Sequence, residues 1–319
     1  MMTNNYDRTE LLAFVARKYY LENCTQSIIA DMVGVTRSSI SRMLTEARQK
    51  GVVEIVVHDP FPSDKKLEQE LQKRLGLKYI SVVDLIVHPG YDDIRKQIGR
   101  AASRLLVKII EPGSKIGISW GTTVQAMVDE IEPYPKFKTQ VTQLTGVLGA
   151  TRHSYSAQIL VEHLAKKLGG EGLYLYAPFF VESEQTAKSL LNNPDVKQAV
   201  SSGKNCDIAI VGIGSVLLDR NSLFDRNHID RRILDCIKQT DAIGDVCGIF
   251  FDKNGIPVDI DLHKRRIGVS LSDLKSINIR LGIAGSKEKA KAILGAINGG
   301  IINALVTDNF TARQILEEI

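Results

Sequence analysis

The chain has 319 residues, of which 44% are hydrophobic and 24% charged, and its net charge is +4 at pH 7. This length and composition fit a folded protein of one large domain or two ordinary ones. The weak positive charge excludes a strongly acidic partner mimic, but it does not by itself indicate a nucleic-acid-binding protein.

The N-terminal residues, the apolar runs and the cysteines indicate the compartment in which the protein is expected. The first ten residues, MMTNNYDRTE, lack the apolar core and basic flank of a signal peptide, and no apolar run is long enough to span a bilayer. The cysteines at 24, 206, 236 and 247 form no CxxC pair and have no zinc-ligand spacing. We therefore expect a cytoplasmic, soluble protein with free, mostly buried thiols, no metal site and no cofactor.

The N-terminal region predicts three short helices followed by a strand. The helices are expected at Asp7–Leu21, at Gln26–Val33, and from the capping residue Thr36 to about Gln49. Gly34 ends the second helix because glycine adopts the left-handed conformation without steric cost. The branched residues Val52–Val57 predict a strand that forms either a wing or the connection out of this module.

The segment QSIIADMVGVTRSSISRML has the spacing of a helix-turn-helix. Ala30 is small where two helices cross, Gly34 makes the turn, and Ile40 packs beneath the crossing, so the second helix can enter a major groove. The candidate DNA-binding side chains are Gln26, Thr36, Arg37, Ser38, Ser39, Ser41 and Arg42, all hydrogen-bonding types. The alternative is a chance match in any pair of amphipathic helices. Four basic residues against one acidic residue between positions 36 and 50 favour DNA binding.

Two prolines in the segment HDPFPSD predict a boundary between a winged helix-turn-helix domain, 1–58, and a second domain, 59–319. A charged helix is expected at 63–75. Strand candidates then follow, namely YISVVDL, KIGISW, TQVTQLTG, GLYLYA, CDIAIVGIG, VCGIFFD, INIRLGIAG and NALVTD, with helical patterns at 92–110, 122–131, 155–168, 286–297 and 311–318. This alternation predicts a Rossmann-like α/β domain, a mostly parallel sheet with helices on both faces.

The segment GISWGTT, residues 117–123, is a candidate anion site. A strand passes through a glycine turn into a helix, which directs free N–H groups and the hydroxyls of Thr122 and Thr123 at one point. A phosphate or carboxylate would fit, although the same hydroxyls could serve only as helix caps. The segment lacks GxxxxGK[ST], and Gly212-Ile213-Gly214 provides only part of a dinucleotide-binding pattern.

Several motifs occur in an order that resembles one known family. The segments DPF, GISWGTT, VGIGS, AIGDVCGIFFD and GGIINALVTD are similar to those of the SorC family of bacterial sugar-responsive transcriptional regulators, over nearly the whole chain. The resemblance implies a winged helix-turn-helix joined to a sugar-binding domain that resembles glucosamine-phosphate isomerase and CoA-transferase-like folds. It further implies tetramers on operator DNA and control of sugar or polyol uptake and catabolism operons.

The resemblance also implies an effector site. The family's phosphate-binding turn falls on Gly121, Thr122 and Thr123, and a family lysine falls on Lys289, while Ser286 replaces a family glycine. Thr145 stands where some members carry a lysine that forms a Schiff base or an arginine. A threonine can neither form a Schiff base nor supply a guanidinium, so the effector should differ from the effectors of those members or carry one anionic group. The full candidate set is Ser119, Trp120, Gly121, Thr122, Thr123, Thr145, Gln158, Gly214, Asp245 and Lys289.

The roles of some members of this set stay open. Asp245 could accept hydrogen bonds from a sugar diol or could cap a turn. Gln158, with His153, Tyr155 and Ser156, could bond sugar hydroxyls, although a lone histidine is more often structural. Phe179 could form an apolar wall or plain core.

Three functions compete. A sugar-phosphate isomerase-like enzyme would need a positioned acid–base pair, and the sequence shows no convincing one. An architectural DNA-binding protein would sense nothing. We expect a DNA-binding regulator that responds to a sugar or sugar-phosphate effector and is not an enzyme; the sequence leaves open which sugar it senses and whether it represses or activates.

Overall fold

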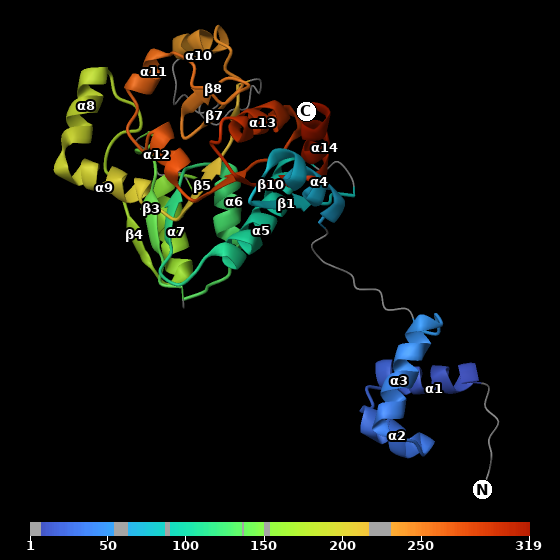
Figure 1. Cartoon of the computed structure of the whole chain (residues 1–319). Coiled ribbons are helices and arrows are strands. Elements are labelled where there is room, and N and C mark those ends of the chain that lie inside the picture. The colour runs from blue at the N-terminus through green and yellow to red at the C-terminus, as the bar shows by residue number, and fades with distance from the viewer. Residues whose placement is uncertain (1–7, 54–62, 87–89, 136, 150–153, 217–230) are drawn as a thin grey trace. The chain divides into compact units, whose positions relative to one another are not determined.

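The computed structural model describes residues 8–53, 63–86, 90–135, 137–149, 154–216 and 231–319. The chain divides into two compact units, Met1–Pro60 and Phe61–Ile319, shown in Figure 1. Each unit is described by itself.

The first unit contains the three expected helices, α1 (Arg8–Tyr20), α2 (Gln26–Val33) and α3 (Arg37–Gln49). The hydroxyl of Thr25 accepts from Ile28 N, and Gly34 ends α2 with φ of 73° while its N–H bonds Ala30 O. Apolar side chains from all three helices share one core: Leu12, Val15, Ala16, Ile29, Ala30, Ile40, Met43, Leu44 and Ala47. Most of the expected strand, residues 54–57, lies outside the described residues.

The second unit is built on a seven-stranded sheet in which every neighbouring pair is parallel. Its order is β1 (Tyr79–Val83), β10 (Ala304–Asp308), β9 (Ile279–Ile283), β5 (Ile208–Gly212), β2 (Lys115–Ile118), β3 (Gln140–Gln143) and β4 (Glu171–Leu173). The expected parallel sheet is therefore confirmed.

Helices cover both faces because side chains alternate along each strand. In β5, Ile208 and Ile210 join one core while Ala209 and Val211 join the other. The first core packs against α5 (Tyr91–Ile109), α6 (Thr122–Glu130) and α7 (Ala157–Leu168). The second packs against α4 (Lys65–Leu75), α12 (Leu271–Ser276), α13 (Ala290–Asn298) and α14 (Asn309–Glu317).

The strand order reverses direction at one place. From β2 the chain adds β3 and β4 on one side, and it then crosses over to place β5 on the other side of β2. The segments after β2 and β5 therefore lead to opposite sides of the sheet. In this architecture, the usual place for a ligand is the crevice between the carboxyl ends of two such strands.

One sequence expectation was wrong at VCGIFFD, which forms a hairpin and not a single strand. β7 (Gly244–Val246) and β8 (Ile249–Phe251) pair antiparallel, and β6 (Gly214–Ser215) completes a three-stranded sheet. Cys247 and Gly248, with φ of 53° and 69°, make the turn between them; two successive positive φ values are typical of a two-residue hairpin turn. This sheet lies near α10 (Arg231–Lys238) and α11 (Asp261–Lys264) in Figure 1.

Other differences are smaller. The sequence did not predict α8 (Glu184–Asn192) and α9 (Pro194–Lys204), which follow β4, or the short helices α11 and α12. The helix expected at 286–297 starts as a 3₁₀ turn, η1 (Lys287–Lys289), before α13. All four cysteines are free; Cys206 and Cys247 are buried and Cys236 is exposed. Across the described ranges, no helix is long and apolar enough to cross a membrane.

Candidate functional site

The outward face of α3 carries the expected DNA-binding side chains. Thr36, Arg37, Ser38, Ser41 and Arg42 are exposed, whereas Ser39, like Gln26 at the start of α2, is half-buried. This face is therefore available to a partner.

The structure separates two groups on this face. The hydroxyl of Thr36 lies 2.9 Å from those of both Ser38 and Ser39, so these three residues build the helix cap. Arg37 and Arg42 are in no ion pair with any described residue. They are therefore the cations best placed to meet phosphates or base edges.

The far end of α3 has a different charge balance. Glu46 pairs with Arg8 of α1 at 2.6 Å and with Lys50 at 2.9 Å. These hydrogen bonds lower the pKa of the Glu46 carboxyl to about 2. The positive charge of Lys50 is thereby compensated, and α1 is tied to α3.

The second candidate site lies at the carboxyl ends of β2 and β5. The N–H of Ser119 donates to Ile210 O at 3.0 Å, and the hydroxyl of Ser119 accepts from Gly212 N at 3.4 Å. These bonds hold the turn after β2 against the end of β5. They fix the start of the crevice described above.

Gly121 is the N-cap residue of α6, with φ of 141° and ψ of 149°, and its N–H donates to Tyr155 O at 3.1 Å. No side chain among the described residues caps this helix. The first N–H groups of α6 therefore face the crevice beside Thr122 and the buried Thr123. A helix N-terminus in this condition stabilises an anion.

Trp120 adds a buried polar group to the same turn. It is 8% exposed, and its indole Nε1 has no hydrogen-bond partner among the described residues. Its ring packs edge-on against the ring of Phe179, with the two ring centroids 6.2 Å apart. Phe179 is 1% exposed, so it is a core residue against which Trp120 packs.

Hydrogen bonds bring three more candidate residues to this edge. Gly214 of β6 pairs with Asp245 of β7, whose buried carboxylate accepts from Gly248 N at 3.3 Å. The hydroxyl of Ser215 donates to Glu288 O at 3.3 Å, which ties β6 to η1. Lys289, half-buried, ends η1 and is thereby held near the same strands.

Ser286 introduces the turn that carries Lys289. Its φ of 108° lies in a region where glycine is at ease and other residues are strained. This is the position at which the resemblance expects glycine. Its N–H donates to Asp308 and Thr311, which hold the strained turn in place.

Two candidates are less closely tied to this group. Thr145 is fully buried after β3, and its hydroxyl has no partner among the described residues. Gln158, half-buried, is the second residue of α7. His153 lies outside the described residues.

A buried arginine was missed by the sequence analysis. Arg266 is 8% exposed and its guanidinium bonds the main-chain oxygens of Cys247 and Val269. Burial lowers the pKa of Arg266 and raises that of the neighbouring Cys247 thiol to about 12. No local motif could have identified it, because Cys247 and Thr145, which place it beside the candidate site, are distant in sequence.

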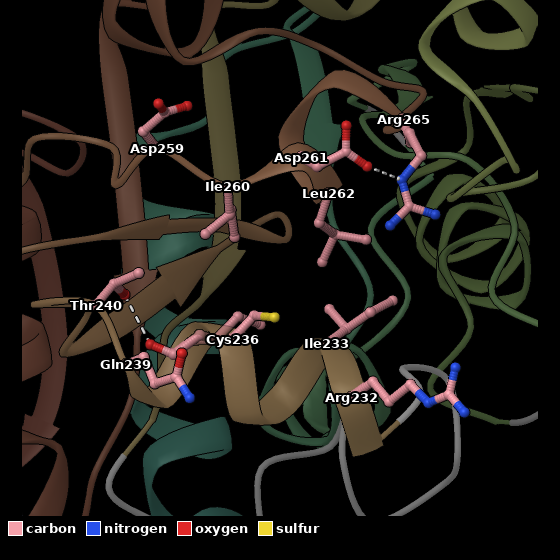
Figure 2. Close-up of a pocket in the computed structure, with 11 residues that line it drawn as sticks. Arg232, Ile233, Cys236, Gln239, Thr240, Asp259, Ile260, Asp261, Leu262 and Arg265 are labelled. Carbon is pink, nitrogen blue, oxygen red and sulfur yellow. Dashed lines mark hydrogen bonds and ion pairs between the residues drawn. The ribbon is translucent and has the colours of Figure 1, made fainter.

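Figure 2 shows a separate cavity of about 500 Å³ between α10 and residues 259–265. Its lining mixes apolar side chains with charged ones, and Asp261 pairs with Arg265 at 2.7 Å. None of the candidate effector residues lines it. The predicted site and this cavity are therefore different places.

Comparison with known proteins gives a consistent result. Residues 59–317 match the model of the sugar-binding domain family, Sugar-bind. The transcriptional regulator LsrR of Escherichia coli K12 is 31% identical over 312 residues, which are 96% of this chain and 94% of that protein. The deoxyribonucleoside regulator of Bacillus subtilis is 28% identical over 98% of this chain and 99% of its own.

A solved structure extends the likeness to the whole fold. The full-length sorbitol operon regulator SorC of Klebsiella pneumoniae aligns with a TM-score of 0.72 and 27% identity, over 97% of this chain and 99% of that one. These proteins are named as regulators, none as an enzyme.

Proposed function

The chain belongs to the SorC family of sugar-responsive transcriptional regulators, and from this we propose that its first unit reads operator DNA while its second binds the effector. Regulation, and not isomerase-like catalysis, is the function of the family members named above. We place the boundary between the two roles at residues 58 and 59. The DNA-binding residues are Gln26 with the α3 face, Thr36, Arg37, Ser38, Ser39, Ser41 and Arg42.

One observation supports the effector site above the others. The N-terminus of α6 has no side-chain cap among the described residues, and it opens at the point where the strand order reverses. The hydroxyl groups of Thr122 and Thr123, main-chain N–H groups and the ammonium of Lys289 are the donors that an oxyanion prefers. A sugar or polyol derivative with an acidic group fits this chemistry.

The remaining candidates would contact the rest of the effector. The carboxylate of Asp245 can accept hydrogen bonds from vicinal hydroxyl groups, and Gln158 can donate or accept. The indole N–H of Trp120, without a partner among the described residues, can donate to a ligand oxygen. Ser119, Gly121 and Gly214 shape the backbone around the ligand, and Thr145 lies beside it.

We further propose that the regulator works as a homo-oligomer, a dimer or a tetramer, on its operator. A dimer places two copies of α3 on successive turns of the duplex, which increases the affinity and the specificity of binding. Light scattering of the purified protein, alone and with operator DNA, measures this assembly.

A ligand screen tests the effector site. Phosphorylated and free sugars and polyols are added to the protein, and compounds that raise its Tm are titrated into an operator-binding assay. A true effector changes both, because ligand and DNA binding are coupled in both directions. An absence of any stabilising ligand would favour an architectural DNA-binding protein, and turnover of the ligand would favour an enzyme.

Variants then locate the binding site. Thr123→Ala and Lys289→Ala should each weaken effector binding about tenfold or more, since each removes a donor to an anion. Lys291→Ala is the matched control, because Lys291 is exposed and pairs with Glu318. Calorimetry that gives wild-type affinity for both site variants would remove the proposed site.

A further inference from the structure

Arg266 is a buried cation that forms no ion pair with a described residue, although the Asp273 carboxylate favours its charged form from a longer distance. The two hydrogen bonds of its guanidinium go to main-chain oxygens: Nη1 donates to Cys247 O at 3.4 Å, and Nη2 donates to Val269 O. A guanidinium has five N–H donors. The two bonds engage two of these five donors, and burying such a charge is costly unless an anion or further hydrogen bonds compensate it.

The position of Arg266 follows from the strand-like segment that carries it. Residues 266–269 run between two other chain segments, with bridges from Arg266 to Phe180 and from Gly268 to Thr145. A Cβ atom on Gly268 would lie 2.9 Å from Arg266 Nη1 and 3.0 Å from Thr145 Cα. The guanidinium therefore lies beside Thr145, at the carboxyl end of β3.

Thr145 supplies an independent sign of a ligand there. It is 0% exposed, and its hydroxyl has no hydrogen-bond partner in the described part of the chain. Buried hydroxyls are nearly always bonded, and an orphan is often the place where a ligand or water belongs. An unpartnered hydroxyl and a buried guanidinium that forms no ion pair with a described residue thus lie next to each other at the carboxyl end of β3.

This corner adjoins the proposed effector site. β3 is the neighbour of β2, whose end leads into Ser119 and the start of α6. Cys247, whose carbonyl Arg266 holds, is within hydrogen-bonding reach of Ser119 and lies two residues from Asp245. Arg266 is therefore linked to the β7–β8 hairpin through Cys247 and to the end of β3 through Gly268.

Lys289 and Arg266 lie beside strands on opposite sides of β2. Lys289 follows β9, which is separated from β3 by β5 and β2. Three strand spacings place the two strand ends about 14 Å apart. An effector between them would meet one cation at each end.

We propose that Arg266 binds a second acidic group of the effector, a phosphate or a carboxylate, beside Thr145 and opposite Lys289. This proposal rests on the proposed effector site. It assigns to Arg266 the cationic role that Thr145 cannot perform, and it replaces the alternative of one anionic group with an effector that is acidic at both ends.

Inorganic phosphate is the probe, with chloride at equal ionic strength as the reference. The full chain is titrated while its Tm is recorded, for the wild type and for Thr123→Ala, Arg266→Met and Arg266→Lys. We expect phosphate to raise the Tm of the wild type. Thr123→Ala and Arg266→Met should each lose part of that rise, and the double variant should lose all of it. Arg266→Lys should keep most of the rise.

Arg280→Met is the matched control, because the guanidinium of Arg280 also bonds a main-chain oxygen, that of Ile277, but near the amino end of β9. Thr145→Val removes only the orphan hydroxyl, keeps the main-chain contacts, and should also weaken the phosphate response. Thr145→Val replaces Arg266→Met in this test if Arg266→Met does not fold.

The outcomes separate the two proposals. If Arg266→Met keeps the full phosphate-induced rise in Tm, the role of Arg266 is overturned, even where Thr123→Ala loses part of that rise. If Arg266→Met does not fold, the same conclusion follows from an unchanged response in Thr145→Val. A loss in Arg280→Met equal to that in Arg266→Met would also overturn it, because the effect would then be structural. A wild type that does not respond to phosphate counts against both proposals.

Discussion

The main-chain N–H of Ser286 donates a 2.8 Å hydrogen bond to the hydroxyl of Thr311, the third residue of α14. That hydroxyl donates in turn to the carboxylate of Asp308 at 2.6 Å, and the same carboxylate oxygen lies 3.2 Å from Ser286 N. The start of α14 thereby holds the turn that leads to Lys289.

Thr311→Val should release this turn. The variant keeps the shape of the side chain but leaves the partly buried N–H of Ser286 and the buried carboxylate of Asp308 with one partner fewer, which costs about 1–3 kcal/mol. Urea unfolding should show the loss, and Thr311→Ser should retain most of the wild-type stability. A midpoint for Thr311→Val equal to that of the wild type would contradict the role of this hydrogen bond.

Ser286→Gly should stabilise the protein. At φ of 108°, a non-glycine residue is strained by about 1–3 kcal/mol. Glycine removes that strain, although its freer unfolded state offsets about 0.5–1 kcal/mol. We expect a net gain of about 1 kcal/mol in chemical denaturation, whereas Ser286→Ala, which keeps the strain, should show no gain.

Arg42→Ala should weaken operator binding without harming the fold. Arg42 is exposed on α3 and forms no ion pair with any described residue, so its loss should cost little stability. A lost contact to a base or a phosphate should reduce affinity about tenfold or more. Gel-shift titration measures this with a fragment from the promoter beside the gene.

Arg17→Ala is the control for that experiment, since Arg17 is an exposed arginine of α1 and its removal changes the net charge equally. Equal losses in both variants would mean that bulk charge, and not the α3 face, governs binding.

Stability should fall as the pH drops from about 6.5 to 4. Nε2 of His263 accepts a hydrogen bond from Phe250 N at 2.9 Å, which requires the neutral ring. Burial lowers the pKa of His263 to about 4. The unfolded chain therefore binds a proton before the folded one does, and the stabilisation present above pH 6.5 is lost on the way to pH 4, by about 1–3 kcal/mol.

Urea midpoints across this pH range measure the effect. A His263→Gln variant, which can still accept from Phe250 N but does not titrate, should show a flatter profile. A profile as steep as that of the wild type would assign the loss to other groups.

Local patterns predicted much of the fold. The three N-terminal helices, the turn at Gly34 and the alternation of strands and helices follow from period, caps and glycine, which act over a few residues. The hairpin at Cys247 and Gly248 was missed, because this pair is not one of the common hairpin-turn dipeptides such as Asn-Gly. The antiparallel pairing of β7 with β8 in the structure is what shows that the chain turns there.

The candidate site was predictable in part for the same reason. GISWGTT shows a strand, a glycine turn and a helix, which is enough to suggest an anion site on α6. The contribution of Arg266 depends on bridges to Phe180 and between Gly268 and Thr145, which join segments remote in sequence. No local pattern contains that information.

The edge of the large sheet has a consequence for how the protein is made. β1 pairs with β10, so the earliest strand of the second unit has its partner near the C-terminus; the bond between Asp84 and Asn309 closes a loop of 225 residues. Contacts of such range slow folding, because loop closure must precede them. During synthesis, the first unit can fold from its own residues, while β1 must wait until nearly the whole chain has left the ribosome.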